Sequence, residues 1–142
     1  MQAGLTGGSG LSPYRRGAAT VSIDVVRTVV IVDDHETFRA TARQLLNAEG
    51  FVVVGEAFDA PSAVETVSRL RPDVLLLDVV LPGVDGFAVI DMLAATGHLP
   101  QTVLISSRQA WTFRRRLATT PARGFISKAD LSGKALEALL IP

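Results

Sequence analysis

The chain has 142 residues, of which 48% are hydrophobic and none is cysteine. This length fits one domain with a single apolar core, and the lack of cysteine excludes disulfides, thiolate metal sites and thiol nucleophiles. Fourteen basic residues balance fourteen acidic ones, which argues against an overall field that attracts nucleic acid or anionic lipid. We therefore expect local recognition of protein partners, with no direct contact to nucleic acid or membrane.

Two regions differ in composition. Residues 1–27 are rich in Gly, Ser, Thr and Ala without a sustained period, which predicts a flexible N-terminal extension. The first ten residues lack the basic start and apolar stretch of a secretory signal. No apolar run in the chain approaches the roughly 20 residues needed to cross a bilayer. We expect a cytoplasmic protein whose folded domain spans residues 28–142.

Five short apolar runs alternate with amphipathic stretches after residue 28, a pattern typical of repeated βα units. Continuous rather than alternating apolarity predicts parallel strands that are covered on both faces. The predicted strands are residues 29–32, 52–54, 74–77, 103–105 and 124–126. The fold class is therefore α/β with a parallel sheet.

The segments between the strands carry apolar residues at helical spacing, which predicts amphipathic helices. Helix starts are indicated by Asp59, Asp85 and Asp130, because each side chain can accept a hydrogen bond from a free amide of a first turn. The apolar stripes are Phe38, Ala42, Leu45 and Leu46; Val64, Val67 and Leu70; Ile90, Leu93 and Ala94; Ala110, Phe113 and Leu117; and Ala135, Leu136, Leu139 and Leu140. Trp111 lies beside the fourth stripe, so we expect it to be partly exposed.

Polar side chains stand at the ends of four predicted strands. Asp33 and Asp34 follow the first strand, Asp78 follows the third, and Ser106 and Lys128 follow the fourth and fifth. Ligands of parallel α/β sheets gather at the carboxyl ends of the strands. Any one of these acids alone could equally cap a helix. All five residues at the correct strand ends favour a site where three acids, a hydroxyl and an ammonium converge.

Three neighbouring carboxylates repel one another unless a hard cation lies among them, and Mg²⁺ is the natural candidate because it prefers oxygen ligands. Such a pocket suits phosphoryl transfer. Lys128 would neutralise charge on phosphoryl oxygens, and Ser106 would offer them a hydrogen bond. Asp78 is then the expected nucleophile, which forms an acyl phosphate.

These motifs resemble the response-regulator receiver domain over about residues 28–140. Residues 29–35 are similar to the family's first strand with its acid pair, residues 78–87 to its phosphoacceptor loop, and residues 124–128 to its fifth strand with an aromatic residue and a lysine. Ser106 matches the family's switch Ser/Thr. The opening Asp33-Asp34-His35 and the segment 128–131 are similar to receivers that precede a helix-turn-helix DNA-binding domain, which suggests a role in transcription regulation.

The resemblance implies a doubly wound, five-stranded parallel sheet with the flavodoxin-like strand order, and Mg²⁺-dependent phosphorylation of Asp78 by a histidine kinase or a phosphotransfer protein. The metal would contact Asp34, Asp78 and the backbone carbonyl of Val80, with Asp33 acting through water. The domain would be a phosphoacceptor rather than an enzyme, although it assists its own phosphorylation and dephosphorylation.

The resemblance also implies a switch. Phosphorylation would draw the Ser106 hydroxyl inward, and Phe125 would move into the vacated space. This change would rearrange the face formed by the fourth helix, the fifth strand and the fifth helix, where an output domain or a second protomer would dock.

Three departures from the family pattern keep an alternative open. Ala129 stands where many members have proline, Val80 where many have a polar side chain, and Pro121 where glycine is common. These residues favour a second hypothesis, a protein-interaction module of the same fold that works without phosphorylation. A phosphatase is disfavoured, because Val80 occupies the place of a second acid two residues after Asp78. His35 is expected to be a surface or capping residue outside the site.

Overall fold

The computed structural model describes residues 26–142, which form alternating strands and helices. All of the predicted extension except Val26 and Arg27 lies outside the described residues. The elements are β1 (Thr28–Val32), α1 (Glu36–Ala48), β2 (Val52–Ala57), α2 (Ala60–Leu70), β3 (Val74–Asp78), α3 (Gly86–Ala95), β4 (Gln101–Ser106), the 3-10 turn η1 (Ala110–Phe113), α4 (Arg114–Thr119), β5 (Gly124–Ser127), the 3-10 turn η2 (Lys128–Asp130) and α5 (Gly133–Leu139).

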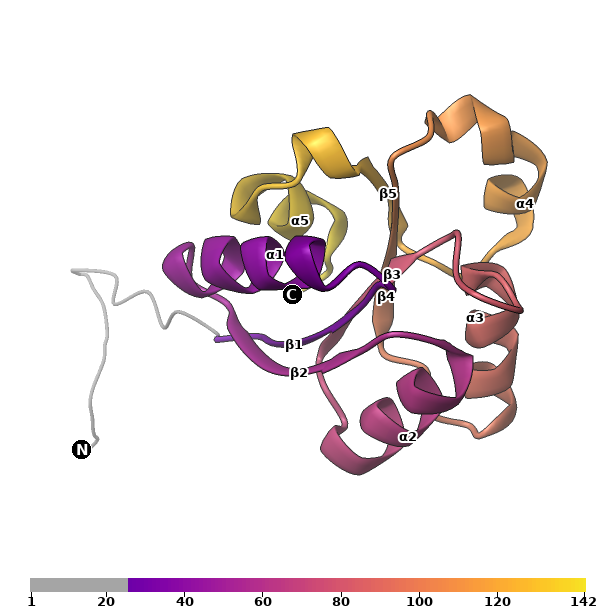
Figure 1. Ribbon diagram of the computed structural model, residues 1–142, viewed down its shortest axis with the longest axis horizontal. Coiled ribbons are helices and arrows are strands. Elements are labelled where there is room, and N and C mark those ends of the chain that lie inside the picture. Colours follow the sequence, from indigo (N-terminus) through magenta and orange to yellow (C-terminus); the bar gives the residue numbers. More distant parts are fainter. Residues whose placement is uncertain (1–25) are drawn as a thin grey trace.

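The five strands form one parallel sheet in the order β2-β1-β3-β4-β5. Helices α1 and α5 cover one face of the sheet, and α2, α3 and α4 cover the other (Figure 1). The chain crosses from one face to the other because β3 pairs with β1 rather than with β2. The predicted doubly wound sheet of flavodoxin-like order is confirmed.

The central strands supply two separate apolar cores. Neighbouring residues point to opposite faces of a strand, so Val30 and Leu75 pack under α2 and α3, whereas Ile31 and Leu76 pack under α1 and α5. All four are fully buried. This two-sided burial explains why β1 and β3 read as continuous apolar runs.

Strand β2 departs from the expected two-sided burial. Its Val52 and Val54 side chains are 44% and 37% exposed, and only Val53 between them is buried among the apolar residues under α1. The cause is position, because β2 lies at the edge of the sheet. The β-branched composition predicted the strand but not its place in the order.

Two of the three predicted helix starts are confirmed. Asp59 caps α2 by accepting a hydrogen bond from the Ser62 amide at 2.9 Å, and the Ser62 hydroxyl accepts one from the Asp59 amide in return. Asp85 caps α3 by accepting from the Ala88 amide at 2.9 Å. These caps fix where the chain enters each helix after a loop at the carboxyl edge of the sheet.

The third predicted start is wrong. Asp130 ends the 3-10 turn η2, and α5 begins two residues after the expected position, where the Ser132 hydroxyl accepts from the Ala135 amide at 2.9 Å. A serine is as good a cap as an aspartate, so composition alone could not choose between them. Among residues 26–142, none of the helices is both long and apolar enough to cross a bilayer.

Candidate functional site

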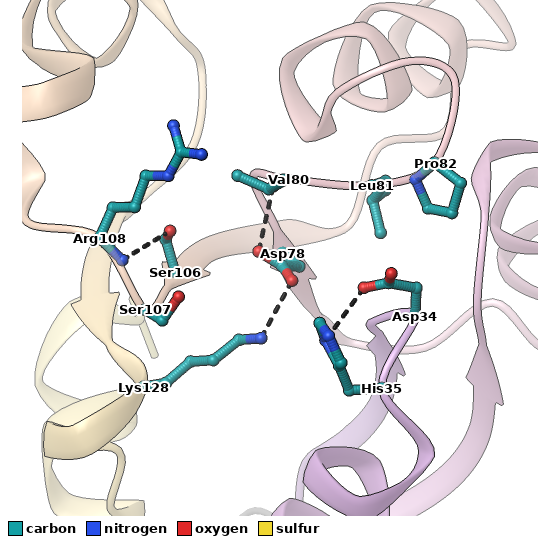
Figure 2. Close-up of a pocket in the computed structure, with 10 residues that line it drawn as sticks. All are labelled: Asp34, His35, Asp78, Val80, Leu81, Pro82, Ser106, Ser107, Arg108 and Lys128. Atoms are coloured by element: carbon teal, nitrogen blue, oxygen red, sulfur yellow. Dashed lines mark hydrogen bonds and ion pairs between the residues drawn. The ribbon is translucent and has the colours of Figure 1, made fainter.

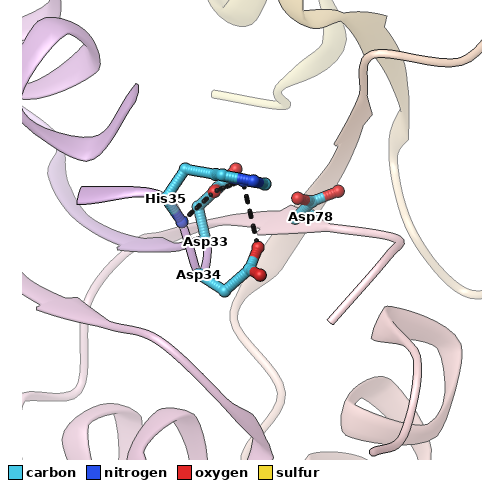
Figure 3. A group of neighbouring side chains, drawn as sticks. All are labelled: Asp33, Asp34, His35 and Asp78. Carbon is cyan, nitrogen blue, oxygen red and sulfur yellow. Dashed lines mark hydrogen bonds and ion pairs between the residues drawn. The ribbon is translucent and has the colours of Figure 1, made fainter. Parts of the chain in front are cut away.

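The carboxyl edge of the sheet collects the polar residues that follow or end the strands. Asp33 and Asp34 directly follow β1, Asp78 is the last residue of β3, Ser106 is the last residue of β4, and Lys128 directly follows β5. Figure 2 shows the side chains of Asp34, Asp78, Ser106 and Lys128 around one pocket, and Figure 3 shows Asp33 beside Asp34 and Asp78. The structure thus places all five predicted residues at one edge.

Lys128 is the central cation of the cluster. Its Nζ lies 2.6 Å from Asp33 Oδ2 and 3.0 Å from Asp78 Oδ2. The contact with Asp78 is a hydrogen bond, whereas Asp33 Oδ2 has no hydrogen bond of good geometry and is held by charge alone. Nζ also lies 4.6 Å from the centre of the Phe38 ring, and the side chain is only 15% exposed. One ammonium therefore holds two buried carboxylates together.

Backbone amides hold the other oxygens of these two acids. Asp33 Oδ1 accepts from the His35 amide at 2.7 Å, and Asp78 Oδ1 accepts from the Val80 amide at 3.1 Å. Arg39 donates to the backbone carbonyl of Asp33 at 2.7 Å. Both oxygens of Asp33 are thus engaged inside the protein, and its side chain is fully buried.

The shared lysine affects the two acids differently. Burial raises the pKa of Asp78 to about 6, because the Val80 amide and Lys128 only partly offset it and the charge of Asp33 adds to it. Burial also opposes ionisation of Asp33, but Lys128 and the His35 amide outweigh it and hold the pKa of Asp33 below its ordinary value. Although burial opposes its charge, Asp33 and Asp78 raise the pKa of Lys128. The metal-free cluster therefore carries one acid that is hard to ionise.

A pocket of about 300 Å³ opens beside Asp78. It is lined by Asp34, His35 and Lys128, by Val80 and its neighbours in the loop after β3, and by Ser106 and Arg108. Asp33 does not line it. Asp78 and Lys128 are therefore the buried charges that a small ligand in this pocket would meet, while Asp33 lies behind them.

Ser106 and Phe125 occupy different surroundings. The buried Ser106 hydroxyl lines the pocket and accepts from the Arg108 amide at 3.0 Å, and it makes no hydrogen bond to Asp78. Phe125 does not line the pocket. It lies on β5, where its ring centre is 6.2 Å from that of Phe113, which in turn is 6.3 Å from that of Phe87. A row of three rings thus connects β5, η1 and α3.

The expected fourth helix is shorter than its apolar stripe suggested. Residues 110–113 form the 3-10 turn η1, and only residues 114–119 form α4. Neither element contains a buried residue, and Trp111 is 68% exposed. Arg116 fastens α4 to α3, because its guanidinium lies 4.4 Å from the Phe87 ring centre and 3.5 Å from Asp85 Oδ2. Phe113 and Leu117 also pack, partly buried, against the apolar core under α2 and α3.

The loop after Asp78 requires glycine at position 86. A Cβ added to Gly86 would lie 2.5 Å from the Asp78 carbonyl oxygen and 3.1 Å from the Val79 Cα, both backbone atoms that cannot move aside cheaply. We expect Gly86→Ala to lower the free energy of unfolding by about 2–3 kcal/mol, as overpacked buried positions do. Urea unfolding followed by circular dichroism measures this change.

Gly83 in the same loop is the matched control for that substitution. Its φ is +82°, but a Cβ there would meet nothing within 4 Å. Gly83→Ala should therefore cost only about 1 kcal/mol, from the left-handed backbone. Equal losses for the two variants would contradict the proposed role of the close approach at Gly86.

The comparisons with known proteins agree with this geometry. The family described as "Response regulator receiver domain" matches residues 29–139. The chain belongs to this family. Receiver domains act in general as phosphoacceptors, and they bind Mg²⁺ at an acidic pocket such as the cluster of Asp33, Asp34 and Asp78.

Individual relatives cover different parts of this chain. The receiver is similar to protein-glutamate methylesterase/protein-glutamine glutaminase 5 of Myxococcus xanthus, with 48% identity over 80 residues, which are 56% of this chain and 23% of that protein. It is also similar to the DNA-binding transcriptional activator EvgA of Escherichia coli, with 31% identity over 71% of this chain and 50% of EvgA. The chain spans about half the length of EvgA and less of the methylesterase.

A solved structure shows the same fold. The receiver domain of the response regulator NarL from Mycobacterium tuberculosis superposes with a TM-score of 0.70 and 29% identity, and the match covers 80% of this chain and 96% of that one.

Two residues near the site were not anticipated from the sequence. Phe38 was assigned to an apolar stripe, yet its ring also faces the Lys128 ammonium. His35 was expected outside the site, yet it lines the pocket. Their place in the chain was the available signal, because His35 directly follows the acid pair and Phe38 lies in the first turn of α1, which begins at Glu36.

Proposed function

We propose that this receiver is a phosphorylation-dependent switch in which Asp78 accepts a phosphoryl group from a histidine kinase or a phosphotransfer protein. The observation that carries the proposal is the 3.0 Å contact between Asp78 and Lys128 at the wall of an open pocket. It pairs a nucleophile with a cation that can meet phosphoryl oxygens.

The transfer of the phosphoryl group to Asp78 requires few side chains of this protein. A carboxylate oxygen of Asp78 forms a bond to phosphorus, and the bond from phosphorus to the donor nitrogen breaks, so that the electron pair leaves with the histidine. Lys128 balances the charge on the phosphoryl oxygens, and Ser106 lines the pocket within the same edge. Asp78 must be ionised to attack, so its pKa of about 6 leaves it competent at neutral pH.

The donor set fits a divalent cation. Three carboxylates lie close together with one lysine, which pairs with Asp33 and Asp78, so the cluster keeps excess negative charge when all three are ionised. Asp34, Asp78 and the backbone carbonyl of Val80 would hold Mg²⁺, with Asp33 acting through water. When bound, Mg²⁺ supplies positive charge for the phosphoryl oxygens.

The signal would leave through the face formed by α4, β5 and α5. The row of rings from Phe87 through Phe113 to Phe125 supports this route, because it joins the helix after the phosphoacceptor loop to β5. The proposed consequence of phosphorylation is an inward turn of Ser106 and a shift of Phe125. An output domain or a second copy of the chain would dock on this face.

The wider assignments follow from the relatives. We propose a cytoplasmic regulator of transcription, because EvgA is a DNA-binding transcriptional activator. Residues 1–27 would be an extension of the folded domain 28–142, and the domain itself would be a phosphoacceptor rather than an enzyme for another substrate.

Labelling with a small-molecule phosphoryl donor and Mg²⁺ tests the proposal. We expect near-stoichiometric phosphorylation of the native chain and none of Asp78→Asn on a phosphate-affinity gel. Asp91→Asn, an exposed acid on α3, is the matched control and should label normally. Absence of labelling in the native chain would favour the interaction module that works without phosphorylation, and rapid turnover of phosphomonoesters would favour a phosphatase.

A further inference from the structure

His35 turns its side chain toward the acids rather than toward the helix that it precedes. It occupies the N-cap position of α1 but makes no side-chain capping bond. Its Nδ1 lies 3.1 Å from Asp34 Oδ1 and 3.2 Å from Asp33 Oδ1, and the ring extends toward Asp78 (Figure 3). One ring nitrogen of His35 and one oxygen of each of Asp33, Asp34 and Asp78 all lie within 4.8 Å of one another. The imidazole is therefore a member of the cluster.

Asp33 is the member least able to meet an ion directly. One of its oxygens accepts from the His35 amide, the other faces Lys128, and the side chain is fully buried. Asp34 and His35 are 34% and 69% exposed and line the pocket together with Asp78. Among the side chains that line the pocket, two carboxylates and one imidazole are thus the donors best suited to a metal ion.

The spacing of these atoms suits ligands of one ion. Two neighbouring ligands of one ion with bonds of about 2.1 Å are about 3.0 Å apart in octahedral geometry and about 3.4 Å apart in the tetrahedral geometry typical of Zn²⁺. The 3.1 Å between His35 Nδ1 and Asp34 Oδ1 lies between these two values. Imidazole nitrogen suits the later first-row transition metals, whereas Mg²⁺ prefers oxygen.

We propose that His35 Nδ1 binds a transition-metal dication of the Co²⁺ or Zn²⁺ kind in this pocket together with Asp34 and Asp78, whereas Mg²⁺ binds there without the imidazole. The proposal rests on the metal site of the proposed function and adds a ligand and a class of ion to it. Because both ions use Asp34 and Asp78, a transition metal would compete with Mg²⁺.

Calorimetric titration of the full chain with Co²⁺ and with Mg²⁺ at one fixed pH tests this selectivity. We expect His35→Phe to lower the Co²⁺ affinity about tenfold or more and to leave the Mg²⁺ affinity within about twofold. The visible absorption of bound Co²⁺ should also change, which gives a readout that does not depend on phosphorylation.

The chain offers a matched control, because it has only one other histidine. His98 is exposed and lies 3.2 Å from an Arg71 nitrogen, far from the cluster in sequence and outside the pocket. His98→Phe should change neither affinity. A tenfold loss in this variant as well would mean that Co²⁺ binds at surface imidazoles and would contradict the proposal.

Further outcomes separate this inference from the proposed function. If Asp34→Asn weakens both ions but His35→Phe weakens neither, the acidic metal site stands and the imidazole ligand is refuted. Equal losses of Co²⁺ and Mg²⁺ in His35→Phe also refute a selective ligand, since the ring would then only orient the carboxylates. If the native chain binds neither ion, the metal site of the proposed function fails as well.

Discussion

Lys128→Met is expected to lower the free energy of unfolding of the metal-free protein by about 3 kcal/mol or more. The substitution removes the cation that lies 2.6 Å from Asp33 and 3.0 Å from Asp78, and both carboxylates stay buried. Removal of one partner from a buried ion pair typically costs about 3–5 kcal/mol, because the remaining charge is uncompensated. Urea unfolding in a chelating buffer measures the loss.

Added Mg²⁺ should recover part of this stability, because a bound cation stabilises the folded state and replaces the missing positive charge. The other lysine of the chain, Lys134, is exposed on α5, and Lys134→Met should change stability by less than about 0.5 kcal/mol. Addition of Asp33→Asn to Lys128→Met should restore much of the loss, since the orphaned charge is then gone. Independent, additive effects of the two substitutions would contradict the ion-pair explanation.

The same variant should also be a poor phosphoacceptor. The ammonium is the positive side chain nearest Asp78, so its loss leaves phosphoryl charge without a fixed partner in the pocket. We expect labelling from the small-molecule donor to slow by two orders of magnitude or so, as for the loss of one preorganised charge. The slowing should persist at saturating Mg²⁺, which separates it from the stability effect.

The sequence predicted the cluster of acids and Lys128, because the position of this cluster depends on the topology of the sheet. Once 29–32 and 74–77 are parallel neighbours, the residues that follow them must share an edge, so Asp33, Asp34 and Asp78 could be placed together before any side chain was seen. Lys128 was placed by the same rule from the short strand 124–126. The predicted strands differ from the observed ones by a few residues at most.

Details that depend on side-chain direction could not be predicted in this way. Three such details depend on side-chain rotamers near the start of α1. Asp33 lies behind Lys128, the Phe38 ring lies beside the Lys128 ammonium, and His35 turns toward the acids. The fourth helix is likewise split into η1 and α4 at Phe113, whose ring lies between those of Phe87 and Phe125. The periodicity of the sequence does not indicate which rotamers these side chains adopt.

Substitution of the phosphoacceptor itself is expected to stabilise the protein, whereas substitution of Lys128 destabilises it. Asp78→Asn should raise the free energy of unfolding of the metal-free protein by about 2–3 kcal/mol at pH 7.5. Burial raises the pKa of Asp78 from 3.8 to about 6, and one pKa unit corresponds to about 1.4 kcal/mol. Between these two values the folded state holds the proton more tightly than the unfolded chain does. The contribution of Asp78 to stability therefore falls as pH rises from about 4 to 6 and stays at its unfavourable limit above that.

The advantage of the asparagine variant should accordingly shrink as pH falls toward 4, and it should vanish only below about pH 3, where Asp78 is protonated in both the folded and the unfolded state. Asp59 provides a control of opposite sign, because hydrogen bonds from the Ser62 hydroxyl and amide lower its pKa. Its contribution to stability is present at neutral pH and is lost on acidification, so Asp59→Asn should never stabilise the protein. Thermal unfolding of the native chain and both variants from pH 4 to 8 without metal measures these differences. A constant gap between Asp78→Asn and the native chain over that range would show that strain, rather than the buried charge, makes this phosphoacceptor costly to fold.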